Sequence, residues 1–209
     1  MNKFGFLFDL DGTLINSEDA ILRCWTILAN EMGVPVSEFT GKHGIPASQT
    51  IQMVFPEMPH DEVIKWRDRL EYLEINDTSG VKMVNGAREL IDYLNENKIP
   101  WSIVTSGTPD LAATRVEATG VHFPETSVTF GDVEKGKPHP DPYLLGAKRL
   151  GLDPSQCWAV EDAPAGVKSA KSAGCKVAAV LTTHGAEELQ EADVLLTNIY
   201  DVLKVSGIL

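Results

Sequence analysis

Two aspartates, Asp9 and Asp11, stand two positions apart directly after the apolar run Phe4–Phe8. In extended backbone, residues i and i+2 point to the same side of the chain, so both carboxyl groups should face one point beyond the end of a strand. Two like charges at such close range are costly unless something compensates them, and a hard cation such as Mg²⁺ does so with oxygen ligands. A carboxylate can also act as a covalent nucleophile, as in enzymes that form an aspartyl phosphate.

Two simpler interpretations of this segment compete with a chemical one. Asp-Gly is a common hairpin turn signal, so Asp11 and Gly12 could form no more than a turn. The segment also begins like a calcium-binding loop, which needs glycine at its sixth position and glutamate at its twelfth. Counted from Asp9, those positions hold Leu14 and Ala20, which excludes the calcium loop.

In a second segment, the apolar run Ser102–Val104 is followed by the hydroxyl residues Thr105 and Ser106 and then by Gly107. Pro109 then suits the start of a helix. A strand that leads through a small polar turn into a helix can form an anion site, because hydroxyl and backbone N–H groups point at the ligand. A simple helix cap is the alternative for this segment taken alone.

A third segment presents Lys137 in a turn rich in proline. From Gly131 to Lys137 the sequence satisfies G-x-x-x-x-G-K. A nucleotide-binding phosphate loop would need Ser or Thr next, whereas Pro138 offers neither a hydroxyl nor an N–H, so we exclude that loop. What remains is a rigid turn that presents one lysine, a point charge suited to phosphate, or else an exposed charged loop.

A fourth segment again places acids at the end of an apolar run. Glu161 and Asp162 follow Trp158–Val160, and Pro164 marks the start of a helix close behind. These acids could merely interact with the helix dipole. They could instead complete a metal site with the first pair of aspartates, if the strand ends meet at one edge of a sheet.

Alternating strands and helices must position these four segments. The strands that we expect are Phe4–Phe8, Trp101–Val104, Ser127–Phe130, Cys157–Val160, Val177–Leu181 and Val194–Leu196. The helices that we expect between them are Ala87–Asn97, Leu111–Thr119, Tyr143–Leu150 and Gly166–Ala173. Such alternation predicts an α/β fold with a Rossmann-like, doubly wound parallel sheet. Ligands of such sheets bind beyond the carboxyl ends of the strands, where Asp9 and Asp11 should lie.

The interval 16–84 interrupts this alternation with helical patterns and little strand signal. Apolar residues recur at helical spacing in two stretches, 21–32 and 63–73. We therefore predict a small helical cap domain, residues 16–84, inserted after the first strand of a core formed by residues 1–15 and 85–209. Trp25 and Trp66 are expected to be ordinary core residues of this insertion.

Composition narrows the partners and the compartment. The net charge of −12 disfavours nucleic acid and anionic membrane surfaces, so a phosphate ligand would need local positive features. Cys24, Cys157 and Cys175 form no C-x-x-C pair, which suggests buried thiols in a reducing compartment. No signal peptide or bilayer-spanning apolar stretch is apparent, so we expect a cytoplasmic protein.

Taken in order, four segments of the chain resemble the four motifs of the haloacid dehalogenase superfamily. These segments are D-L-D-G-T-L, V-T-S-G, G-K-P-x-P-D and V-E-D-A-x-A-G. The chain looks like the phosphatase branch that carries a helical C1 cap after the first motif, and the resemblance covers nearly its whole length. It is most similar to the small sugar-phosphate phosphatases related to 2-deoxyglucose-6-phosphatase, through Trp101–Gly107, Pro142–Leu152 and Glu161–Gly166.

The resemblance implies a role for each motif. Asp9 would be the nucleophile that attacks phosphorus, and Asp11 would protonate the leaving alkoxide and then activate water. Thr105 and the backbone N–H of Ser106 would hold phosphoryl oxygens. Lys137 would neutralise charge on the nucleophile and on the phosphate, which is the kind of stabilisation that phosphoryl transfer needs.

The resemblance also implies a Mg²⁺ site. Asp162 would bind the ion together with the Asp9 carboxylate and the Asp11 backbone carbonyl, and Glu161 would be a direct or water-mediated outer ligand. In the insertion, Gly41–Pro46 resembles the substrate-facing cap loop of the family. Its candidates for sugar contacts are Lys42 and His43; several relatives place a cation shortly after the second glycine, where this chain has Ile45, Pro46 and Ala47.

We therefore expect a Mg²⁺-dependent phosphatase that hydrolyses a small sugar or polyol phosphate through a phospho-aspartate, as a monomer or weak dimer. One alternative is a sugar phosphomutase, which would return the phosphoryl group to the sugar, although the missing cap cation argues against it. Another is a non-catalytic sensor of a phosphorylated metabolite. Such a sensor should have lost a catalytic group, yet Asp9, Asp11, Lys137 and Asp162 are all present.

Overall fold

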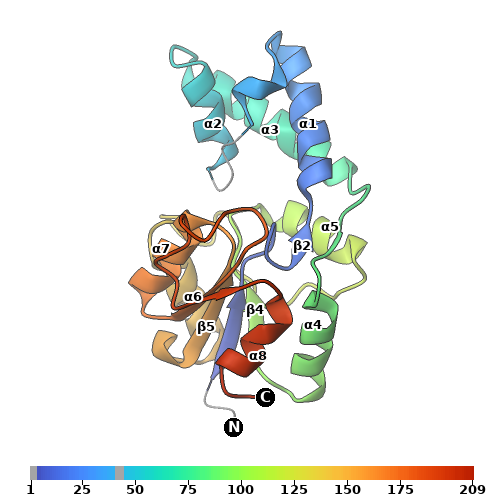
Figure 1. Ribbon diagram of the computed structural model, residues 1–209. Helices are drawn as coiled ribbons and strands as arrows, with labels where there is room; N and C mark the ends of the chain where they lie inside the picture. Colours follow the sequence, from blue (N-terminus) through green and yellow to red (C-terminus); the bar gives the residue numbers. More distant parts are fainter. Residues whose placement is uncertain (1–3, 41–44) are drawn as a thin grey trace. The chain divides into compact units, whose positions relative to one another are not determined.

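The computed structural model describes residues 4–40 and 45–209. The chain forms two compact units (Figure 1): Met1–Asn16 together with Lys82–Leu209 contains the sheet, and Ser17–Val81 is helical. We refer to them as the sheet unit and the helical unit and describe each by itself. The sequence pattern puts the limits of the insertion at 16 and 84.

The sheet unit is built on five parallel strands. These are β1 (Gly5–Phe8), β4 (Trp101–Ile103), β5 (Cys157–Glu161), β6 (Lys176–Val180) and β7 (Val194–Leu196). They lie in the order β4-β1-β5-β6-β7, and every neighbouring pair is parallel. The chain passes from β1 to β4 on one side and then to β5 on the other. Strand β1 therefore stands at the switch point, where α/β sheets bind their ligands.

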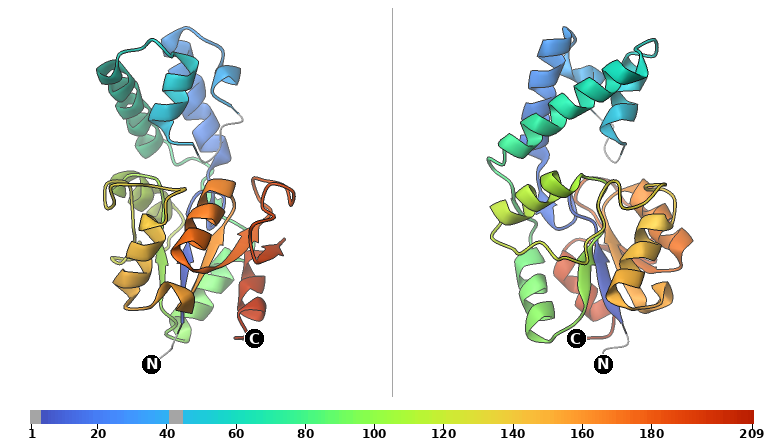
Figure 2. Two further views of the ribbon diagram at one scale, coloured as in Figure 1. Left: turned by 90° about the vertical axis from the view of Figure 1, so that its left-hand side faces the viewer. Right: turned by 180° about the vertical axis from the view of Figure 1, so that it is seen from behind.

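Helices cover both faces of this sheet (Figure 2), which confirms the predicted doubly wound α/β fold. The helices of the sheet unit are α4 (Ala87–Glu96), α5 (Pro109–Ala118), α6 (Asp141–Leu150), α7 (Pro164–Ala173) and α8 (Val202–Val205), with 3-10 turns η2 (Pro154–Gln156) and η3 (Ile199–Asp201). Leu7 of β1 faces α6 so closely that a Cβ on Gly146 would lie 3.0 Å from it. Phe6 and Phe8, which point the opposite way, stack with ring centroids 5.8 Å apart.

One predicted strand is wrong. Within Ser127–Phe130, only Val128 pairs with the sheet, through a single parallel bridge to Val104 beside β4. Beyond Val128 the chain turns: the N–H of Thr129 donates to the Asp132 carboxylate (2.8 Å), and the N–H of Phe130 donates to the Gly107 carbonyl (2.8 Å) in the loop after β4. The pattern that predicted a strand therefore corresponds to one buried bridge residue, Val128, followed by a turn.

The two segments that connect the sheet unit to the insertion pair with each other. β2 (Ile15–Asn16) and β3 (Lys82–Met83) form a two-stranded antiparallel ribbon, with Ile15 opposite Met83. The chain leaves the sheet unit and returns to it through neighbouring backbone.

In its described residues, the helical unit packs three helices and a 3-10 turn around a core of its own. These elements are α1 (Glu18–Met32), η1 (Val36–Glu38), α2 (Ala47–Val54) and α3 (His60–Asn76). The buried residues of this core are Cys24, Leu28, Ala29, Phe39, Ile51, Val63 and Leu70. Trp25 packs on Phe39 with ring centroids 4.9 Å apart, as expected of a core residue. No helix in the described part of the chain is both long and apolar enough to span a bilayer.

Candidate active site

The four chemical segments converge at the carboxyl ends of β1, β4 and β5. Asp9 follows β1, Thr105 lies two residues beyond β4, and Glu161 ends β5 with Asp162 next to it. The N–H of Asp9 continues the sheet by donating to the Val160 carbonyl (2.9 Å). These four residues are all buried, with exposed fractions from 1% for Glu161 to 9% for Asp9. The sheet thus joins residues from distant parts of the sequence in one water-poor place.

Lys137 reaches the same place from the loop before α6. Its ammonium group donates to Asp9 Oδ1 (2.6 Å), to Glu161 Oε1 (2.5 Å) and to the Val104 carbonyl (2.9 Å). These acceptors match the three donors of an ammonium group, and 7% of the side chain is exposed. The side chain of Lys137 is therefore a fixed, buried charge between two carboxylates, although most of the loop that carries it is exposed.

The electrostatics of this site leave an excess of negative charge. Burial raises the pKa of Asp9 well above its usual range, Glu161 and Asp162 add to that effect, and Lys137 opposes it. Burial alone would lower the pKa of Lys137, but the attraction of Asp9 and Glu161 outweighs it and raises that pKa above its usual value. The lysine therefore stays charged, and one positive charge faces several acids.

Asp9, Glu161 and Asp162 form an acidic cluster, in which one carboxylate oxygen from each lies within 4.8 Å of the others. Burial and the charge of Glu161 raise the pKa of Asp162 to about 6, although hydrogen bonds from Thr183 and Thr13 lower it. Several hard oxygen donors at this spacing suit a hard divalent cation. The residues present therefore fit a metal ion of this kind.

The turn after β1 is shaped to approach Asp162. Gly12 has φ of +88°, and a Cβ on it would lie 2.2 Å from Asp162 Oδ2, so a side chain does not fit there. The hydroxyl of Thr13 donates to Asp162 Oδ1 (3.1 Å). The Asp-Gly pair does form a turn, and that turn brings the first motif against the fourth.

A segment after β6 also reaches this site, and the sequence analysis missed it. The hydroxyl of Thr183 donates to the Asp162 carboxylate, and His184 Nδ1 lies 3.0 Å from the Asp162 carbonyl oxygen. Thr182 donates to the Gly12 carbonyl (2.5 Å). The signal was available in the sequence, because polar residues again follow an apolar run at the carboxyl end of a strand.

Tyr143 is a second group that the sequence analysis did not assign to the site. Its hydroxyl donates to Glu161 Oε1 (2.5 Å), and its ring lies below the Lys137 ammonium at 5.3 Å from the centroid. Burial and the neighbouring Glu161 raise the pKa of Tyr143. A Cβ on Gly166 would lie 2.0 Å from the Glu161 carboxyl group. Glu161 is therefore enclosed, and one of its oxygens accepts from two donors.

The side chain of Asp11 has different neighbours from that of Asp9. Its Oδ2 accepts a hydrogen bond from Nη1 of Arg115 at 2.8 Å, and the exposed fractions of the two side chains are 26% and 5%. Arg115 belongs to the last turn of α5 in the sheet unit. The acidic cluster contains no side-chain oxygen of Asp11 among the described residues. An arginine, which the sequence analysis overlooked, therefore neighbours the proposed proton donor.

Thr105 and Ser106 stand where α5 is about to begin. The N–H of Thr105 donates to the Val128 carbonyl (2.9 Å), and its hydroxyl accepts from the Gly107 N–H (3.1 Å). Thr105 is buried and Ser106 is exposed. The turn after β4 thus has a fixed backbone, with α5 starting at Pro109 as predicted. Lys42 and His43, the candidates for sugar contacts, lie outside the described residues.

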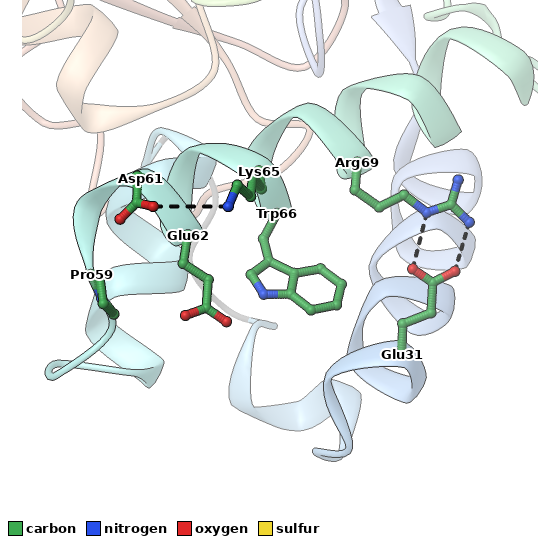
Figure 3. A pocket seen from close by; sticks show the side chains of 7 residues that line it. All are labelled: Glu31, Pro59, Asp61, Glu62, Lys65, Trp66 and Arg69. Atoms are coloured by element: carbon green, nitrogen blue, oxygen red, sulfur yellow. Dashed lines mark hydrogen bonds and ion pairs between the residues drawn. The ribbon is translucent and has the colours of Figure 1, made fainter.

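The helical unit holds a separate groove of about 390 Å³ (Figure 3). Its lining residues are Glu31, Pro59, Asp61, Glu62, Lys65, Trp66 and Arg69. Two ion pairs, Arg69 with Glu31 and Lys65 with Asp61, join four of its five charged side chains. Trp66 lines the groove and also packs against the core of the helical unit, as expected.

Together, the doubly wound sheet and the acids and lysine at its switch point define a hydrolase of the haloacid dehalogenase type. The chain matches the haloacid dehalogenase-like hydrolase family over residues 6–180 and belongs to it. It is 41% identical over 199 residues to hexitol phosphatase A of Escherichia coli K12, across 95% of this chain and 92% of that protein. It is 30% identical to 2-deoxyglucose-6-phosphate phosphatase 1 of Saccharomyces cerevisiae, across 89% and 83% of the two chains.

A solved structure shares this fold. The crystal structure of a hydrolase from Pseudomonas syringae superposes with a TM-score of 0.85, covering 98% of this chain and 97% of that one, at 23% identity. At that identity the likeness concerns the fold alone. The relatives confirm the resemblance to sugar-phosphate phosphatases that the motifs predicted.

Proposed function

We propose that the protein is a Mg²⁺-dependent phosphatase that hydrolyses a small sugar or polyol phosphate. The observation that carries this proposal is the contact of Lys137 with Asp9 beside the acidic cluster. A carboxylate suited to nucleophilic attack, a fixed cation and several oxygens suited to a metal ion lie together at one edge of the sheet, which supports these roles. Phosphoryl transfer depends mainly on such positioning and charge stabilisation.

Asp9 acts as the nucleophile. A carboxylate oxygen of Asp9 forms a bond to phosphorus while the bond from phosphorus to the substrate oxygen breaks. Asp11 gives its proton to that oxygen, so the sugar or polyol leaves as an alcohol. A water molecule then attacks the phosphorus of the aspartyl phosphate, Asp11 takes one of its protons, and the bond to Asp9 breaks to release inorganic phosphate.

Lys137, Thr105 and Ser106 hold the transferred group. Lys137 offsets charge on Asp9 and on the phosphoryl oxygens, and because its position is fixed by three acceptors it needs little reorganisation during the reaction. The Thr105 hydroxyl and the Ser106 N–H donate to phosphoryl oxygens at the start of α5. Each of these groups lies in the sheet unit.

Asp9 and Asp162 hold the Mg²⁺, with the Asp11 backbone carbonyl, and Glu161 supports the ion directly or through water. When bound, the ion supplies positive charge against the acids and the phosphoryl oxygens. Glu161 has a second role, because it accepts the hydrogen bonds that hold Lys137 and Tyr143 in position.

The relatives support the substrate class. The names of two relatives refer to hexitol and to 2-deoxyglucose 6-phosphate, so we infer a phosphorylated polyol or hexose as the substrate of this chain. We assign Lys42 and His43 to contacts with its hydroxyl groups. The net charge of −12 favours a small metabolite over nucleic acid. Cys24, Cys157 and Cys175 are buried and form no disulfide with one another, which suits the cytoplasm.

The test is phosphate release from a panel of monophosphates that includes a hexitol phosphate, 2-deoxyglucose 6-phosphate and a nucleotide. We expect inorganic phosphate from the first two, loss of activity in EDTA and recovery when Mg²⁺ is added. Failure to release phosphate from any substrate with Mg²⁺ present would overturn the proposal. Isomerisation of a sugar phosphate without accumulation of phosphate would establish the phosphomutase instead.

A further inference from the structure

The ion pair between Arg115 and Asp11 is the feature of the site that the proposed roles leave unexplained. The two residues are 104 positions apart, and Nη1 of Arg115 lies 2.8 Å from Oδ2 of Asp11. Arg115 is on α5, on a helix face whose other buried residues are Leu111, Ala112 and Val116. An arginine on an apolar face is costly to bury unless a charged partner offsets the loss of hydration.

The proposed proton transfer depends on where the carboxyl group of Asp11 lies. It lies in the turn after β1 rather than in regular structure, and 26% of its side chain is exposed. Proton transfer requires the carboxyl group within hydrogen-bond distance of the reacting oxygen. A misplacement of about 1 Å can cost on the order of a hundredfold in rate. A group that holds one carboxyl oxygen also fixes where the other one lies.

Arginine is suited to holding a carboxyl group in one orientation. Its guanidinium is planar, stays charged and presents donors in a rigid fork, whereas a lysine ammonium is a compact point charge on a flexible stem. At 5% exposure, the Arg115 side chain is enclosed by the sheet unit and is itself fixed. Arg115 and Asp11 belong to the same unit, so the pair is built into the fold that carries the motifs.

We propose that Arg115 is a positioning residue for the reaction, whose guanidinium holds the Asp11 carboxyl group in the orientation that proton transfer requires. This inference rests on the phosphatase function proposed above. It assigns Arg115 no contact with substrate, so its whole effect on the chemistry passes through Asp11.

The first test compares two leaving groups in Arg115→Met. A hexitol alkoxide needs a proton donor, whereas p-nitrophenolate is stable enough to leave without one. We expect kcat/KM for the hexitol phosphate to fall about a hundredfold and kcat/KM for p-nitrophenyl phosphate to fall less than about threefold. Equal losses with both substrates would overturn the inference, because a merely structural role lowers both.

The second test asks whether the effect passes through Asp11. In an Asp11→Asn background, adding Arg115→Met should change hexitol phosphate turnover by no more than about twofold, because the group that Arg115 positions is already absent. A further loss as large as that in the wild-type background would overturn the inference. Arg67→Met, which changes a partly exposed arginine of α3, is the control and should leave the turnover of both substrates unaffected.

Arg115→Lys keeps the test decisive if Arg115→Met fails to fold, as judged by circular dichroism. The lysine retains the charge without the fork, so we expect the same difference between the substrates at about tenfold. Absence of any difference in a folded Arg115→Lys protein would count against the inference. Wild-type protein that releases no phosphate would instead reject the proposed function, which separates the two failures.

Discussion

The ammonium nitrogen of Lys137 lies 2.6 Å from Oδ1 of Asp9, although 128 positions of sequence separate the two residues. The same nitrogen lies 2.5 Å from Oε1 of Glu161. Two strand ends and one loop therefore meet at a single charge, and the nucleophile that we propose has one oxygen fixed by it. Several consequences of this arrangement can be measured.

Lys137→Met should lower kcat by at least about a hundredfold, because it removes a fixed cation from a buried site where charge develops. It should also lower the melting temperature of the metal-free protein, since Asp9 and Glu161 lose their positive partner. Steady-state kinetics and thermal melting measure the two effects. Lys135→Met, which changes an exposed lysine of the same loop, is the control. Equal turnover in both variants would contradict the role of Lys137.

Asp9→Asn should abolish turnover and leave the fold intact. The amide is a far weaker nucleophile than the carboxylate, while its shape is nearly the same. Removing one of the clustered acids should also keep the melting temperature of the metal-free protein equal to wild type or raise it. Asp92→Asn, at an exposed position of α4, serves as control. Activity within tenfold of wild type would rule out Asp9 as the nucleophile.

Thr183→Val should weaken Mg²⁺ binding by about tenfold with little change in fold, because the hydroxyl that orients the Asp162 carboxylate is replaced by a methyl group of similar size. Titration calorimetry on the purified protein measures the affinity directly. Thr26→Val, in which the hydroxyl bonds only its own helix turn among the contacts described, is the matched control. Unchanged affinity in Thr183→Val would show that the segment after β6 does not support the metal site.

The stability of the metal-free protein should rise as the pH falls from about 7 to 5. The pKa of Asp162 is raised to about 6 by burial and by Glu161. A carboxyl group with a raised pKa in the folded state favours folding most when it is protonated, and it loses that contribution as the pH rises through about 6. The acids held by arginines titrate lower, since Arg149 and the backbone of Thr129 lower the pKa of Asp132 to about 2.

Melting curves in EDTA across this range test the sign of the effect. Saturating Mg²⁺ should reverse the trend, because protons compete with the metal for the same oxygens. The variant Asp162→Asn should show a flatter dependence on pH. A melting temperature in EDTA that falls steadily from pH 7 to 5 would contradict the raised pKa.

The sequence predicted the sheet well because its signals were local. One apolar run ends in Asp9 and another ends in Glu161, and each run predicts both a strand and the position of its carboxyl end. Parallel pairing of the strands then brings these ends together. Helix starts were less accurate: α6 begins at Asp141, two residues before the expected start at Tyr143, because proline is accepted in the first turn of a helix.

The supporting groups of the site were harder to predict. Arg115 is one charge on an amphipathic helix, and only its place on the apolar face distinguishes it from a solvated arginine. Tyr143 has the pattern of a core aromatic, and nothing local shows that its hydroxyl reaches Glu161. Ser127–Phe130 resembled a strand in its sequence, but that pattern does not reveal that the chain turns directly after Val128, where the Thr129 N–H donates to Asp132.

The ribbon of β2 and β3 has a consequence for how such proteins diversify. Because Ile15 and Met83 face each other across antiparallel backbone, the ends of the inserted segment are only about 5 Å apart. A longer, shorter or wholly different polypeptide can be joined at these neighbouring ends without shifting the register of β1 or the acids that follow it. Selection could therefore exchange the part of the chain that we assign to recognising the sugar or polyol while leaving the bond-breaking groups untouched.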